Sequence, residues 1–171
     1  MDNQVVQHSN SSTQLSILIW MEELALGRAL TIAVRALVDE MHARLAGQGF
    51  DGLRPAFGYV LNAAADAPLS ASDVAALLGM TKQGAAKLIA EMEFAGYVIR
   101  TESGDDARAR PLALTERGRQ ALAAAVEAQR EIERTWAGLS APADVAAMRR
   151  VLAAVIAHAS ADGPPPLRPA W

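Results

Sequence analysis

The chain has 171 residues, of which 51% are hydrophobic and 20% are charged, and its formal net charge at pH 7 is -3. Enough apolar side chains are present for a packed core, and the frequent alanine and leucine favour a mainly helical fold. The absence of cysteine excludes disulfides, thiolate nucleophiles and cysteine-bound metals, and the negative charge argues against coating of nucleic acid through bulk positive charge.

The first part of the chain is predicted to be a polar tail followed by one long helix. Residues 1–13 are rich in serine, asparagine and glutamine, and we expect them to be disordered. They lack the features of a signal peptide, and no apolar run is long enough to span a membrane, so we expect a cytoplasmic protein. From Leu15 to about Ala46 we predict one long helix, in which the polar residues between Arg28 and His42 recur at steps of three and four and nearly all the others are apolar. We expect a second copy of the chain to cover part of it; the alternative is a central helix in a monomeric bundle.

Two shorter helices follow. One begins at Arg54-Pro55 and runs to about Ala65, where the linker 66–69 ends it. The other, over 71–78, begins at a sequence that matches a capping box, in which Ser70 and its partner three residues later satisfy the first amides. A short turn and a further helix come next, which is the pattern of a helix-turn-helix unit.

The helix expected over 82–95 has two distinct faces. At 100° per residue its apolar side chains cluster on an inner arc, while long polar side chains lie on the opposite, outer arc. A recognition helix needs this division, because one arc packs on the preceding helix and the other faces the major groove. We therefore predict DNA contacts from Thr81, the expected N-cap, and from Lys82, Gln83 and Lys87; an ordinary solvated helix face is the alternative. Glycine is unfavourable inside a helix, so Gly84 indicates either that a DNA backbone approaches the helix closely there or that the sequence has drifted neutrally at an exposed site.

A β-hairpin is predicted after this helix. Its strands cover 97–100 and 112–114, and Pro111 is expected to restrict the second strand to an edge. The return limb carries Arg108 and Arg110 on one side, and arginines on a protruding hairpin suit the minor groove or the flanking phosphates. A solvated loop of mixed charge is the alternative.

Two long helices, over 115–138 and 140–159, and a proline-rich tail, 162–171, complete the chain. Each helix carries an apolar stripe, and neither carries a catalytic or DNA-binding motif. A small winged unit cannot bury both stripes, so we expect the two helices to pack against the first helix and against a partner chain.

The chain resembles the MarR (multiple antibiotic resistance regulator) family of winged-helix regulators over about residues 15–159. The resemblance is carried by the sequences LGMTKQGAAKLIAEMEFAGYV and DDARARPLALTERGR. It implies a mainly α fold with a small β-hairpin wing, in which residues 15–52 and 115–161 form a helical dimerisation region and 53–114 the winged helix-turn-helix domain. It also implies a homodimer that binds double-stranded DNA at a pseudo-palindromic operator and a small aromatic effector. Ala107, Pro111 and Phe94 depart from the family pattern.

We therefore expect an operator-binding transcriptional regulator, a repressor relieved by a small ligand. The second hypothesis is a winged-helix protein that binds another protein and no DNA, since the net charge is negative and Phe94 lies on the outer arc. We expect no enzyme, no cofactor and no metal, because His8, His42 and His158 lie far apart and no catalytic or phosphate-binding motif is present. The effector pocket is predicted from bulky residues that could equally form a core: Trp20, Met41, His42, Phe57, Tyr59 and Trp136.

Overall fold

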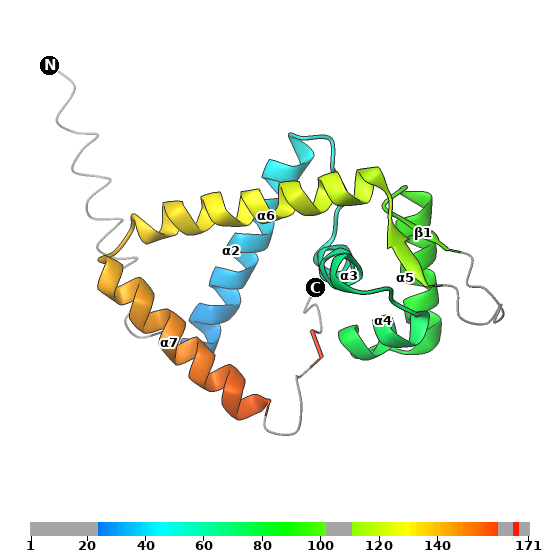
Figure 1. Ribbon diagram of the computed structural model, residues 1–171. Helices are drawn as coiled ribbons and strands as arrows, with labels where there is room; N and C mark the ends of the chain where they lie inside the picture. The colour runs from blue at the N-terminus through cyan, green and yellow to red at the C-terminus, as the bar shows by residue number, and fades with distance from the viewer. Residues whose placement is uncertain (1–23, 102–110, 161–165, 168–171) are drawn as a thin grey trace, which may run out of the picture. The chain divides into compact units, whose positions relative to one another are not determined.

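A computed structural model describes residues 24–101, 111–160 and 166–167, and the chain divides into two compact units, 1–39 and 40–171. Six helices and one two-stranded antiparallel hairpin make up the described part (Figure 1). The predicted fold class, mainly α with a small hairpin, is therefore confirmed. Within the described ranges, no helix combines the length and the apolar character that a membrane crossing requires.

Helix α2 (Leu26–Ala46) begins later than the predicted start at Leu15. Leu24 and Ala25 precede it without helical structure, so a continuous helix from Leu15 is wrong; the stretch before Leu24 lies outside the described residues. Gly27 falls in the first turn of α2, where a poor helix former is tolerated. The periodic polar residues begin only at Arg28, inside α2, and the mostly apolar stretch before them carries no signal that locates the start of the helix.

The helix-turn-helix and its supports form the core of the second unit. Helices α3 (Pro55–Asp66), α4 (Ala71–Leu78) and α5 (Lys82–Phe94) agree with the predicted ranges to within one residue at each end. They pack around fully buried side chains, which include Val60, Leu61, Val74, Leu78, Ala85, Ile89 and Met92. Because the apolar arcs of three helices meet there, the orientation of α5 is fixed by burial.

The hairpin consists of β1 (Val98–Arg100) and β2 (Leu112–Leu114), and it has a third neighbour that the sequence did not indicate. Leu69, in the linker after α3, pairs with Leu112, whose amide donates a hydrogen bond of 2.8 Å to the Leu69 carbonyl. The sheet has two strands, so β2 lies at an edge as predicted, and this single bridge adds one contact at Leu112 on its other side. Pro111 precedes the strand, and it takes part through its carbonyl, which accepts from the Thr101 amide at 2.9 Å.

Two long helices end the described part. Helix α6 (Glu116–Ala137) buries Ala121, Ala128 and Ile132, whereas α7 (Pro142–Ala159) buries no residue. An ion pair of 2.7 Å between Arg149 and Glu133 joins α7 to α6, and the Arg149 guanidinium lowers the pKa of Glu133. Apart from this ion pair, the apolar side chains of α7 stay exposed within this chain: Met148, Val151, Leu152, Val155 and Ile156.

Candidate nucleic-acid interface

Helix α5 has the two faces that its sequence predicted. Its inner arc is buried against the rest of the unit and consists of Ala85, Leu88, Ile89 and Met92. The predicted contact residues Thr81, Lys82, Gln83 and Lys87 are all exposed. The buried arc therefore directs these four side chains toward solvent, where DNA can reach them.

The start of α5 is fixed by local hydrogen bonds. Gly79 adopts a left-handed conformation with φ 59°, which lets the chain leave α4 and turn at once into α5. The Thr81 hydroxyl then accepts a hydrogen bond of 3.1 Å from the amide of Gly84. The remaining free amides and the positive end of the helix dipole favour an anion at this end, beside Lys82. Neither Lys82 nor Lys87, the only lysines of the chain, forms an ion pair with a carboxylate in the described ranges.

Gly84 has a local explanation that neither sequence interpretation included. A Cβ at this position would lie 3.3 Å from the Thr81 Oγ1 and 3.6 Å from the Met80 Sδ. A side chain would thus crowd the hydroxyl that caps the helix. Glycine at this position makes room for the cap, and a close approach of DNA is not needed to explain it.

Both carboxylates of α5 are held in ion pairs by arginines from other elements. Glu91 pairs with Arg54, the residue before α3, and Arg54 also lies over the Phe57 ring, 4.5 Å from its centroid. Glu93 pairs with Arg100 of β1 at 3.2 Å. These pairs reduce the repulsion that two unpaired carboxylates would exert on a DNA backbone. Neither arginine was predicted to contact α5, because each is brought to this helix by the tertiary fold.

The capping box at the start of α4 is present as predicted, and it changes the pKa of its carboxylate, Asp73. The Ser70 amide donates to the Asp73 carboxylate at 2.8 Å, and the Ser70 hydroxyl donates to it at 2.7 Å. These hydrogen bonds lower the pKa of Asp73. A carboxyl whose pKa is lowered by folding adds stability above its unfolded pKa, and this stability is lost as pH falls through the folded value.

We therefore expect Asp73→Asn to lower the unfolding temperature more at pH 7 than at pH 3, because the stabilisation by the charged carboxylate begins to be lost as pH falls below the ordinary pKa of 3.8. Thermal unfolding followed by circular dichroism at both pH values measures this difference. Asp66→Asn is the matched control, since it removes the same charge from the last residue of α3, whose side chain takes no part in a capping box. An equal loss from Asp73→Asn at both pH values would contradict the assignment.

The wing is described only at its base. Thr101 and Pro111 close the hairpin, since the Pro111 carbonyl also accepts from the Thr101 hydroxyl at 3.0 Å. Arg108 and Arg110 lie outside the described residues, so the minor-groove contacts assigned to them stay predictions.

The residues predicted to form an effector pocket occupy different environments. Phe57 is buried and makes an edge contact with Tyr97 at 6.1 Å between ring centroids. Met41 and Tyr59 are partly buried against the same core. His42 is exposed, Trp136 is half-buried near the end of α6, and Trp20 lies outside the described residues. The structure thus brings three of the six side chains to one core, and the pocket stays a prediction.

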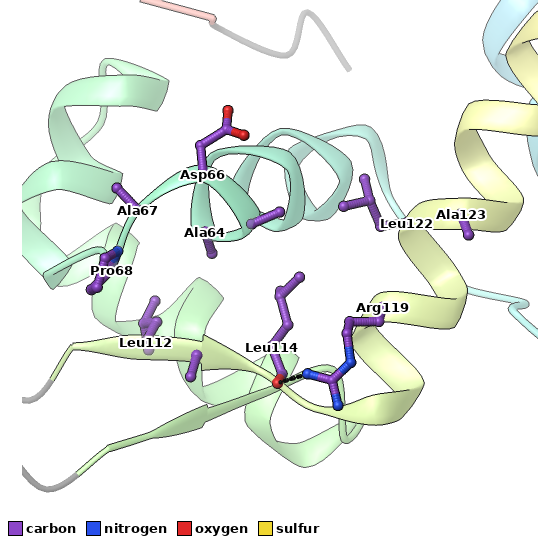
Figure 2. A pocket seen from close by; sticks show the side chains of 11 residues that line it. Ala64, Asp66, Ala67, Pro68, Leu112, Leu114, Arg119, Leu122 and Ala123 are labelled. Atoms are coloured by element: carbon purple, nitrogen blue, oxygen red, sulfur yellow. Dashed lines mark hydrogen bonds between the residues drawn. The ribbon is translucent and has the colours of Figure 1, made fainter.

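A shallow groove of about 500 Å³ lies elsewhere, between the end of α3, β2 and the start of α6 (Figure 2). Its lining is mostly alanine and leucine, with Asp66 and Arg119 as the ionisable groups. Arg119 is already engaged, because its guanidinium donates to the Leu114 carbonyl at 3.0 Å and to Glu116 at 2.9 Å. The groove includes none of the predicted effector residues. The described residues also contain no cluster of three or more His, Asp or Glu side chains suited to a metal ion.

Comparisons with known proteins agree with this geometry. A family model described as MarR family matches residues 51–109. The chain is similar to the MarR family protein Rv2887 of Mycobacterium tuberculosis in complex with salicylic acid, with 28% identity over 79% of this chain and 98% of that one and a TM-score of 0.58. It is also similar to the transcriptional repressor CouR bound to a 23-mer DNA duplex, with 27% identity over 79% and 94% of the two chains and a TM-score of 0.65.

A more distant structure shares the fold alone. MepR, a transcription regulator of the Staphylococcus aureus multidrug efflux pump MepA, is 16% identical over 79% of this chain and 98% of its own, with a TM-score of 0.62. No curated protein sequence matched the chain.

Proposed function

We propose that the chain belongs to the MarR family of winged-helix regulators, and that it is a sequence-specific, operator-binding transcriptional regulator that acts as a cytoplasmic repressor and catalyses no reaction. The observation that carries the proposal is the outer arc of α5. There Lys82, Gln83 and Lys87 are exposed in the first half of a capped helix whose opposite arc is buried. A helix-turn-helix that presents long polar side chains in this way is suited to the major groove.

Each side chain has a distinct role in this mechanism. Lys82, beside the helix N-terminus, binds a phosphate and sets the register of the protein on the duplex. Gln83 donates and accepts hydrogen bonds at an adenine edge, and Lys87 donates to a guanine or to a phosphate. Arg108 and Arg110 of the wing bind the adjacent minor groove or its phosphates.

The regulator acts as a homodimer. Helix α7 has no buried residue, although its apolar side chains form a continuous stripe. A helix with such a stripe is stable in water only when another surface covers it, and a second copy of the chain supplies that surface. Two recognition helices then bind the two halves of a pseudo-palindromic operator, whose centres lie about 34–36 Å apart or a multiple of that distance.

A small aromatic effector relieves repression. The salicylic acid complex of Rv2887 supports a ligand of this class. A ligand that binds one spacing of the two recognition helices more tightly than another shifts the dimer toward that spacing. A thermal-shift screen with phenolic acids tests this part; the absence of both a shift and an effect on DNA binding would remove it.

Selection of bound fragments from genomic DNA, at moderate salt and with the full-length protein, tests the main proposal. We expect enrichment of a pseudo-palindromic site. Failure to enrich any sequence would instead favour a winged-helix protein that binds another protein and not DNA.

Arg108→Ala is expected to weaken operator and non-specific binding by similar factors, because a minor-groove or phosphate contact carries little sequence information. Loss of one such contact lowers the slope of log K against log salt by about one unit. Fluorescence anisotropy over a salt series measures the slope. An unchanged slope would contradict a role for Arg108 at the DNA.

A further inference from the structure

Phe94 is the most exposed large hydrophobic side chain in the described ranges, at 96%. It is the last residue of α5, and the arginine-paired carboxylates Glu91 and Glu93 stand close by in the same turn. Full exposure means that this phenyl ring adds nothing to the core. Burial of so large an apolar side chain would stabilise a protein, and the fold of this chain gains nothing from it.

The direction of Phe94 matches that of the predicted base-reading residues. At 100° per residue, Phe94 falls within about 20° of both Gln83 and Lys87 around the helix axis. Along the axis it lies about 10 Å beyond Lys87, at 1.5 Å per residue. Ala90, exposed on the same arc between them, is too small to stand in the way. One face of α5 therefore runs from polar side chains at its start to an apolar ring at its end.

The surroundings of the ring permit it to approach DNA. Glu91 and Glu93 flank the outer arc and are the only carboxylates of α5, yet Arg54 and Arg100 neutralise both. The ring is thus presented to DNA without an unpaired negative charge on its own helix. This environment favours DNA over a basic protein surface, which unpaired carboxylates would attract.

We propose that Phe94 is a specificity-determining residue that packs on the 5-methyl group of a thymine in the major groove. Contact between an apolar side chain and this methyl group is a recognised means of distinguishing thymine from the other bases. The axial distance places the thymine about two to three base pairs from the position contacted by Lys87, given a rise of 3.4 Å per base pair. The inference rests on the proposed function, and it adds an apolar contact to the polar readout given there.

The test replaces thymines in the selected operator with deoxyuridine, one symmetric pair at a time, and measures affinity by fluorescence anisotropy. Deoxyuridine pairs as thymine does and lacks only the methyl group. For the wild-type protein we expect one pair of positions at which the replacement weakens binding about three- to fivefold per half-site, the effect of one buried methyl-sized group. Phe94→Ala should bind thymine and deoxyuridine equally at that pair, and Phe94→Leu should retain most of the preference.

Ile99→Ala is the matched control, since Ile99 is an exposed apolar residue on β1 and not on the outer arc. It should keep the wild-type response to deoxyuridine. Because Phe94 is exposed, its variants should keep the wild-type unfolding temperature, so an altered response reports DNA contact.

Each other outcome overturns the inference. If an operator is selected and Phe94→Ala keeps the wild-type response to deoxyuridine at every position, Phe94 reads no thymine, while the proposed function stands. Loss of a protein partner in Phe94→Ala, with an unchanged thymine preference, makes the ring a protein-docking residue. A selection that enriches no site overturns the proposed function and this inference together.

Discussion

Gly118→Ala is expected to destabilise the protein by about 3 kcal/mol, at the upper end of the range for overpacked sites. Gly118 is buried in the first turn of α6, and its amide donates to the hydroxyl of the N-cap Thr115 at 2.9 Å. A Cβ at this position would lie 2.0 Å from the carbonyl oxygen of Tyr97 and 3.0 Å from its carbonyl carbon. Both are backbone atoms and cannot rotate away. The alanine would force the start of α6 away from the hairpin and disturb the base of the wing.

Chemical denaturation gives the free energy of unfolding for this comparison. Gly58→Ala is the control, because Gly58 lies inside α3 and a Cβ there would meet nothing within 4 Å. Alanine favours a helix interior over glycine by roughly 0.5–1 kcal/mol, so this variant should be slightly more stable than the wild type. Equal stability of Gly118→Ala and the wild type would contradict the close approach of Gly118 to the Tyr97 backbone.

The double variant Val151→Asp, Val155→Asp is expected to convert the dimer to a monomer. These two residues are 57% and 58% exposed in the single chain and lie within the apolar stripe of α7. Two carboxylates in a buried dimer contact would have to lose their hydration without a partner, and several kcal/mol is the usual penalty for each. The two DNA-binding units would then no longer be linked, and tight binding to a two-site operator should be lost.

Sedimentation velocity measures the change in mass. The double variant Ala146→Asp, Ala153→Asp is the matched control, because it adds the same two charges to exposed positions on the opposite face of α7. This control should remain dimeric. Dimers of equal strength in both variants would show that α7 does not form the contact.

The local parts of the helix-turn-helix were predictable because their signals lie within a few residues of one another. The Ser70 capping box, the left-handed Gly79 and the Thr81 cap define both ends of α4 and the start of α5. The periodicity of α5 then separated its buried arc from its exposed one. Each of these signals depends on one stretch of chain and needs no knowledge of the tertiary structure.

Features formed by distant residues could not be predicted in this way. The ion pair of Arg54 with Glu91 joins residues 37 positions apart. The bridge from Leu69 to Leu112 turns an apparent linker into a third partner of the hairpin. The groove beside Arg119 likewise exists only after α3, β2 and α6 come together. Phe94 was noticed as a departure from a family pattern, but its full exposure and its paired neighbours became evident only in three dimensions.

The closed base of the hairpin makes the segment between Thr101 and Pro111 replaceable. Two hydrogen bonds to the Pro111 carbonyl hold the ends together, and Leu69 anchors β2 from its other side. Segments of other lengths can therefore be grafted between these ends without altering the backbone pairing that supports α5, because insertions are tolerated where they break no buried hydrogen bond. The minor-groove contact proposed for the wing can therefore be engineered separately from the base contacts proposed for α5.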